Sequence, residues 1–185
     1  MSHPVKSDSA APFKILRVQP RCPEALALLE EAVAEANALY PELHSPGRPI
    51  PSNDLLPERA VFLLASTGME VAGCAALYPL DASTAEVRRV FVCKRFRQRG
   101  VARLMLAELV HQARAFGYRR LWLETGYRQS PAIQFYESAG FQRIPPFGRY
   151  VGDPTSVCFG LELESEDAVR KQHLGAASNA VVYPL

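Results

Sequence analysis

The segment from residue 85 to residue 117 constrains the fold of this chain most, because strand, turn and helix signals follow one another without a gap. Residues 85–92 are rich in β-branched and aromatic side chains, which is typical of a strand. A basic turn follows and closes at Gly100. The apolar residues that then recur at helical spacing are Val101, Leu104, Met105, Leu109, Ala113 and Phe116. A helix start presents unpaired N–H groups, and glycine lets backbone approach a ligand, so this turn predicts a phosphate-binding site.

The other elements predicted from the sequence surround this segment in a strand-rich order. Further strands are expected at residues 13–18, 60–65, 70–78, 121–124, 142–144 and 156–163, and further helices at residues 23–40 and 130–140. The second and third strands flank a short turn and predict a hairpin. Ser130 is expected to cap the start of the last helix, with Pro131 as its first helical residue. A helix joins the strands at 85–92 and 121–124, which predicts a parallel pair in an α/β mixed sheet.

The chain length favours one domain. The 185 residues suffice for a single core, expected at residues 13–163. Residues 1–12 are expected to be a flexible lead, and residues 164–185 form a tail without a periodicity that predicts structure. The proline-rich loop at residues 41–57 is either an ordinary solvated loop or a lid that faces a substrate.

Composition excludes several classes of protein. A formal net charge of +2 is too small to indicate a nucleic-acid partner by itself. The apolar runs are too short to span a membrane, and the N-terminus lacks the apolar region of a signal peptide, so we expect a cytoplasmic protein. The four scattered cysteines have no histidine at metal-ligand spacing, which predicts reduced thiols and no metal site.

Two motifs in these elements match a known family. The first is the hexapeptide Arg97-Gln98-Arg99-Gly100-Val101-Ala102, which matches the pattern Gln/Arg-x-x-Gly-x-Gly/Ala. The second is Ala132-x-x-x-Tyr136-x-x-x-Gly140-Phe141. With the order of elements between them, the chain resembles the GNAT superfamily of acyl-CoA-dependent N-acetyltransferases over residues 13–163. Within it the chain is similar to a bacterial subgroup of small-molecule acetyltransferases.

The resemblance implies the fold and the cofactor. In the GNAT fold a central sheet changes from antiparallel to parallel pairing, splays between the strands at 85–92 and 120–124, and is flanked by about four helices. Acetyl-CoA places its pyrophosphate on the hexapeptide turn and pairs its pantetheine arm with the open edge of the first strand. That edge is expected to present unpaired groups at Phe91 and Val92. The cofactor-binding residues implied are Val90, Phe91, Val92, Arg97, Gln98, Arg99, Gly100, Val101, Ala102, Gln129, Ala132, Phe135 and Tyr136. Many members have Asn where this chain has Gln129, which alters one contact to the pantetheine arm.

The implied reaction is direct attack of an amine on the acetyl thioester, which makes the chain an acyltransferase. Because an alkyl amine has a pKa near ~10.4, a base must remove a proton. Glu86 and Glu124 are the two candidates, and either can instead pair with Arg88 or Arg89. A backbone N–H near residues 90–92 is the expected oxyanion donor.

Tyr136 occupies the position of the family's acid. A phenol, with a pKa of ~10, can protonate or hydrogen-bond a departing thiolate. The position would otherwise indicate a core tyrosine beside Phe135, and the match to the family motif favours the acid.

The acceptor is expected to be a primary amine of a small molecule. The residues expected to line its site are His44, Tyr127, Arg128, Arg149 and Tyr150. The two arginines can hold a carboxylate by bidentate pairing, which favours an amino acid or a related amine. Alternatives are a protein N-terminus or lysine as acceptor, a non-catalytic acyl-CoA sensor, and a basic surface for nucleic acid, although no binding motif for the last is present. A homodimer is left open.

Overall fold

The computed structural model describes residues 12–43 and 52–163, and within them seven strands form one mixed sheet in the order β1-β2-β3-β4-β5-β7-β6. The strands are β1 Lys14–Arg17, β2 Val61–Thr67, β3 Glu70–Pro79, β4 Thr84–Val92, β5 Arg120–Gly126, β6 Gln142–Ile144 and β7 Ser156–Glu162. All neighbours are antiparallel except β4 and β5, which are parallel. The predicted hairpin, the predicted parallel pair and the α/β mixed sheet are therefore confirmed.

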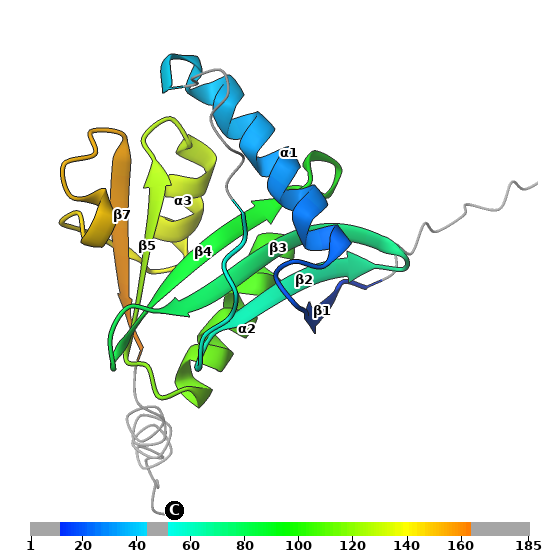
Figure 1. Cartoon of the computed structure of the whole chain (residues 1–185), viewed down its shortest axis with the longest axis horizontal. Helices are drawn as coiled ribbons and strands as arrows, with labels where there is room; N and C mark the ends of the chain where they lie inside the picture. The colour runs from blue at the N-terminus through cyan, green and yellow to red at the C-terminus, as the bar shows by residue number, and fades with distance from the viewer. Residues whose placement is uncertain (1–11, 44–51, 164–185) are drawn as a thin grey trace, which may run out of the picture.

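Helices cover both faces of this sheet (Figure 1). The α-helices in the described residues are α1 Pro23–Leu39, α2 Val101–Ala115 and α3 Ser130–Ser138, together with the 3₁₀ helices Pro41–Leu43, Lys94–Phe96 and Gly148–Tyr150. In the view of Figure 1, α1 crosses the front of the sheet and α2 lies behind it. Three α-helices thus stand where about four helices were expected.

The helix ends follow from proline and glycine. Pro23 lies in the first turn of α1, and the chain leaves the helix at Tyr40, just before Pro41. Gly117 and Gly140 adopt positive φ angles of 80° and 88° after α2 and α3, as left-handed C-terminal caps require. The expected cap at Ser130 is wrong, because Ser130 is the first helical residue and Gln129 holds the N-cap position.

The feature that positions the site is the splay between β4 and β5. Their pairing runs from the partners Thr84 and Arg120 to the partners Val87 and Leu123, and then ends, although both strands continue. Beyond that point β5 pairs only with β7 and β4 only with β3. In Figure 1 the two strands accordingly diverge toward the top of the molecule. The parallel edge of β4 is thereby left open.

A bulge in β4 lies just beyond the end of this pairing. Two residues of β4, Arg89 and Val90, stand opposite one residue of β3, and Arg89 has a positive φ of 57°. The strands come so close here that a methyl group added at Gly73 would overlap the carbonyl oxygen of Phe91. A bulge bends its strand and increases the local twist, which turns β4 away from β5.

Several expectations lie outside the described residues. They concern the lead at residues 1–11, the part of the proline-rich loop at residues 44–51 and the tail at residues 164–185. Within the described residues, none of the helices combines the length and apolar character needed to cross a membrane.

Candidate active site

The turn before α2 is built from left-handed backbone. Gln98 and Gly100 have φ angles of 60° and 81°, and Gly100 is the N-cap residue of α2. Alternation between right- and left-handed residues directs successive N–H groups to one side. The backbone N–H groups of residues 98–103 have no acceptor within the part of the chain that the structure describes, whereas Leu104 N–H already bonds the Gly100 carbonyl. These N–H groups form an anion-binding concavity at the positive end of the helix dipole.

The arginine side chains of this turn have partners within the protein. The guanidinium of Arg97 donates to both carboxylate oxygens of Glu35 in α1, at 2.8 and 2.7 Å, and its Nε donates to the Val92 carbonyl at 2.9 Å. Arg99 stacks over the rings of Phe13 and Phe96. The turn therefore presents its backbone to an anion, while the Arg97 guanidinium is already paired with Glu35 and the exposed Arg99 guanidinium makes no hydrogen bond to the described residues.

The open edge of β4 starts beside this turn. Cys93 N–H donates to the Ala72 carbonyl in β3 at 3.0 Å, so Cys93, and with it Phe91, directs its backbone groups toward β3. Val92 faces the opposite edge, as the bond from Arg97 to its carbonyl shows. Of the two residues expected to present unpaired groups, only Val92 faces the open edge, and alternation places Val90 on the same side.

Glu86 lies where the splay begins, and its carboxylate is bonded to side chains of the protein. It is 6% exposed, accepts a hydrogen bond of 2.6 Å from the Tyr150 hydroxyl and pairs with Arg149 at 3.0 Å. Burial and the bond to Glu86 raise the pKa of Tyr150 to about 12, so its hydroxyl remains a donor. Glu86 thus fixes the 148–150 turn against β4.

Glu124 lies on the same face of the sheet as Glu86. Glu86 pairs in register with Trp122, and Glu124 follows Trp122 by two residues, which returns it to that face. Its carboxylate accepts a hydrogen bond of 3.0 Å from the Ser156 hydroxyl. Burial raises the pKa of Glu124, with Asp153 and Glu86 adding to the rise and Ser156 opposing it. Glu124 is therefore a carboxyl group that is more easily protonated than an exposed glutamate, and it shares its face of the sheet with Glu86.

Tyr136 of α3 packs from the opposite face. Its ring lies against Phe141 and Phe159 and is 6% exposed. Burial raises its pKa, and the nearby Glu124 carboxylate contributes to that rise. The hydroxyl makes no hydrogen bond to the described residues. Among these residues, Thr84 Oγ1 is the only side-chain polar atom that is both fully buried and unpaired, so the Tyr136 hydroxyl is not fully buried. The Tyr136 hydroxyl is thus free to meet a ligand.

The other predicted substrate residues separate into two places. Arg149 and Tyr150 join Glu86 at the splay, as described above. Arg128 instead binds the end of α1, where it pairs with Glu42 at 2.8 Å and donates to the Leu39 carbonyl, while Tyr127 packs against Tyr40. His44 lies outside the described residues. Arg149 and Tyr150 thus lie at the splay, and both predicted arginines have protein carboxylates as partners. A role of these residues in substrate binding stays a prediction.

Gln129 is the residue that departs from the family pattern. Its side-chain oxygen accepts a hydrogen bond of 3.0 Å from the Thr125 hydroxyl at the end of β5. The side-chain nitrogen of Gln129 makes no hydrogen bond to the described residues, so this donor remains free at this end of the splay.

The bulge brings in residues that the sequence did not single out as a site. Asn53 is 1% exposed, and its side-chain oxygen accepts a bond of 3.0 Å from Arg89 Nε. Asp54 pairs with Arg88 at 3.0 Å. Arg88 and Arg89 were expected as partners of Glu86 or Glu124, and only Arg88 approaches Glu86, at 4.0 Å. A bulge has no clear signature in a single sequence, which is why this arrangement was missed.

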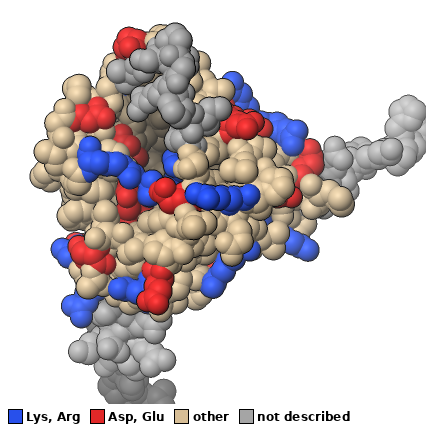
Figure 2. All heavy atoms as spheres, viewed as in Figure 1, with Lys and Arg blue, Asp and Glu red and all other residues tan. Residues whose placement is uncertain are grey.

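A pocket of about 270 Å³ adjoins the bulge on the face that carries α1. Its lining residues are Ala25, Leu28, Leu29, Ala32, Val33, Ala36, Asn53, Phe62, Cys74, Arg89, Val90 and Phe91. Figure 2 shows that this face of the molecule is hollowed between the side of β5 and the side of α1, with acidic and basic side chains around the hollow. Among the described residues, no group of three or more His, Cys, Asp or Glu side chains could hold a metal ion.

Comparisons with known proteins agree with this geometry. The family described as "Acetyltransferase (GNAT) family" matches residues 27–141. The uncharacterized N-acetyltransferase YsnE of Bacillus subtilis is 42% identical over 98 residues, which cover 52% of this chain and 65% of that protein, just under two thirds of its length. The IAA acetyltransferase of Azospirillum brasilense is 33% identical over 150 residues, covering 77% of this chain and 93% of that protein.

The fold has close counterparts among solved structures. A Klebsiella pneumoniae protein assigned as an acyl-CoA N-acyltransferase superimposes with a TM-score of 0.67 and 27% identity. The match covers 82% of this chain and 98% of that one. The similarity thus extends over most of this chain and nearly all of that one.

The electrostatics of Glu124 predict a stability that depends on pH. A carboxyl group whose pKa is raised by folding stabilises the native state below its unfolded pKa of about 4.3, and this contribution is lost as the pH rises through the folded pKa. Glu124→Gln has no charge to bury. The free energy of unfolding of Glu124→Gln, measured by chemical denaturation, should therefore increase relative to that of the wild type as the pH rises from 4 to 8.

The variant Ser156→Ala provides the matched comparison. It removes the hydrogen bond that favours the ionised carboxylate and should enlarge the loss of stability with rising pH. A difference between Glu124→Gln and wild type that stays constant over this pH range would show that Glu124 is not destabilised by ionisation.

Proposed function

The chain belongs to the acetyltransferase (GNAT) family, and from this premise we propose that it moves an acetyl group from acetyl-CoA to a primary amine of a small molecule by direct attack in a ternary complex. Membership makes the chain an acyltransferase. The observation that carries the proposal is the splay, where an open edge of β4 joins an anion-binding turn and lies beside an acid and a base candidate.

The residues at the splay fit acetyl-CoA. The unpaired N–H groups of residues 98–103 suit its pyrophosphate, and the outward edge at Val90 and Val92 suits the amides of its pantetheine arm. The Arg97 side chain already donates to the Val92 carbonyl, so the backbone N–H groups of this edge remain for the ligand. At the start of α3, the free side-chain nitrogen of Gln129 can donate to the pantetheine arm. Ala132 and Phe135 of α3 pack against the core and stay partly exposed, which leaves them available for contact with the same arm. When bound, acetyl-CoA supplies a thioester carbonyl and a thiol leaving group.

Glu124 is the better candidate for the base. An alkyl amine with a pKa near ~10.4 must lose a proton before it attacks, and a base is most effective when its pKa approaches the working pH. Burial raises the pKa of Glu124, and a single hydroxyl contacts its carboxylate. Glu86 is held by Arg149 and Tyr150. We therefore assign proton removal to Glu124, directly or through water, and assign positioning of the 148–150 turn to Glu86.

Tyr136 is the proposed acid. Its raised pKa keeps the phenol protonated at neutral pH, and its hydroxyl has no protein partner to compete with a ligand. Glu124 and Tyr136 lie near enough to affect each other electrostatically while reaching the splay from opposite faces of the sheet. A proton can therefore leave the amine on one side and be delivered to the thiolate on the other.

The experiment that tests the function measures release of free coenzyme A with a thiol reagent across a panel of amines. The panel includes amino acids, simple alkyl amines and peptides with free N-termini or lysine side chains. We expect turnover with small amines. Turnover with peptides alone would identify a protein acetyltransferase instead, and thermal stabilisation by acetyl-CoA without thiol release from any amine would indicate a sensor.

Tyr136→Phe is expected to lower kcat by about 100-fold or more, because it removes the proton donor for the leaving thiolate. The ring remains, so packing against Phe141 and Phe159 and the thermal shift produced by acetyl-CoA should stay close to wild type. An unchanged kcat in Tyr136→Phe would remove this residue from the mechanism.

The pH dependence of kcat/KM separates the two carboxylates. In the wild type, kcat/KM should rise with pH through the pKa of Glu124, at a midpoint above the ordinary carboxyl value of about 4.3. Glu124→Gln should lose this rise and about 10²–10⁴ of the activity. Glu86→Gln should keep the rise and change mainly KM, through Arg149 and Tyr150. The reverse result, with the rise lost only in Glu86→Gln, would reassign the base.

A further inference from the structure

Four arginines of β4, of the segment after β5 and of the 148–150 turn differ in their partners. Arg88 pairs with Asp54, Arg149 with Glu86 and Arg128 with Glu42. Arg89 forms no ion pair with any carboxylate of the described residues. Its Nε donates to the Asn53 side chain at 3.0 Å and one Nη donates to the Ser52 carbonyl at 3.1 Å, and both acceptors are neutral. The second Nη has no bond to the described residues.

The surroundings of Arg89 make this positive charge costly. The side chain is partly buried, and the charged groups that act on it are Arg88, Arg149 and Asp54, of which Asp54 is already bound to Arg88. Burial lowers the pKa of Arg89, and the charge of Arg88 adds to this effect. A guanidinium in such a place gains from an anion supplied by a ligand.

Arg89 adopts a backbone conformation that is unfavourable for a residue with a side chain. Its positive φ of 57° occurs at the bulge that opens the edge of β4. Asn53 fixes the guanidinium in turn, because its side-chain nitrogen donates to the Pro20 carbonyl at 2.7 Å while its oxygen accepts from Arg89. The guanidinium is thus oriented before any ligand arrives.

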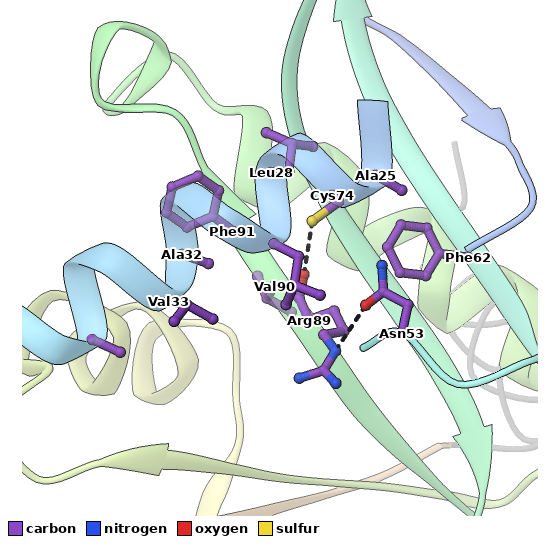
Figure 3. Close-up of a pocket in the computed structure, with 12 residues that line it drawn as sticks. Ala25, Leu28, Ala32, Val33, Asn53, Phe62, Cys74, Arg89, Val90 and Phe91 are labelled. Atoms are coloured by element: carbon purple, nitrogen blue, oxygen red, sulfur yellow. Dashed lines mark hydrogen bonds between the residues drawn. The ribbon is translucent and has the colours of Figure 1, made fainter. Parts of the chain in front are cut away.

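The rest of the pocket is apolar. Figure 3 shows Leu28, Ala32 and Val33 of α1 beside Val90 and Phe91 of β4. Arg89 and Asn53 are the polar members of the lining. Its volume of about 270 Å³ is several times the ~30 Å³ that one water occupies in the liquid, and an apolar cavity of this kind favours an apolar group over water.

The pocket adjoins the edge of β4 on which the proposed function depends, since Val90 lines the pocket and lies on that edge. A ligand in the pocket therefore lies beside the place where the acyl group would be held.

We propose that Arg89 binds the carboxylate of the acyl acceptor and that the apolar pocket holds its side chain, so that the acceptor is an amino acid, or a similar carboxylate-bearing amine, with a large apolar or aromatic side chain. This inference rests on the proposed function and names its substrate class. It replaces the expectation from sequence that Arg128 and Arg149 bind the carboxylate, because both have carboxylate partners within the protein.

The test compares three amines in the coenzyme A release assay: phenylalanine, phenylalaninamide, which lacks the carboxylate, and glycine, which lacks the side chain. Wild type should prefer phenylalanine to each of the others in kcat/KM by about 10- to 100-fold, the value of a charge-assisted contact or a buried ring. In Arg89→Gln the preference over phenylalaninamide should disappear, while activity toward phenylalaninamide itself is retained. Arg89→Lys keeps the charge and should retain part of the preference.

Two further variants control this comparison. Arg143→Gln removes an exposed arginine paired with Glu137 and should leave all three activities unchanged. Ala32→Leu fills the pocket and should lower kcat/KM for phenylalanine much more than for glycine. Equal preference for phenylalanine and phenylalaninamide in wild type, or an equal loss of both in a folded Arg89→Gln, would overturn the proposal.

Direct binding separates this inference from the function. Isothermal titration of N-acetylphenylalanine, the expected product, into the enzyme without acetyl-CoA should give a dissociation constant about 10- to 100-fold lower than that of its amide, and Arg89→Gln should abolish the difference. If no amine releases coenzyme A but this difference is present, the transferase function fails and the pocket assignment stands. If turnover occurs with other amines and neither compound binds, the pocket assignment fails and the function stands.

Discussion

The early end of the pairing between β4 and β5 is the constraint on which the rest of the site depends. Parallel strands that stayed paired would bury every backbone group between them and leave nothing for a ligand. The bulge at Arg89 turns β4 away after Val87, and Gly73 allows β3 to follow it closely. The open edge, the start of α2 and the pocket under α1 all lie along this one deviation from a regular sheet.

The charges at the splay are arranged so that each carboxylate has a different environment. Glu86 is buried but bound to Arg149 and Tyr150, whereas Glu124 has one hydroxyl partner and a pKa raised by burial. Two carboxylates on one face would otherwise repel each other, and carboxylates in environments that differ in this way are typical of acid–base sites. Holding Glu124 in this way costs stability at neutral pH, a cost that proteins commonly bear at functional sites.

Much of the fold was readable from local signals. Proline and glycine placed the ends of α1, α2 and α3, and short runs rich in apolar, β-branched and aromatic residues placed the strands, because these signals act over a few residues. The exceptions are informative. Ser130 is a good capping residue, yet the chain bends one residue earlier, at Gln129, where Thr125 at the end of β5 binds its side chain. Likewise Phe91 and Val92 look alike in sequence, and only the register with β3 decides which one faces the opening.

The sequence alone therefore determined the order of elements, the parallel pair, the glycine turn before α2 and the family, since each follows from residue types at fixed spacing. The tertiary structure alone decided which charged groups are free. Arg97, Arg128 and Arg149 find carboxylates on elements that lie 62, 86 and 63 positions away in the chain, whereas Arg89 finds only neutral oxygens. Partner choice over such separations depends on how α1, the bulge and the 148–150 turn pack together, and no local pattern encodes that packing.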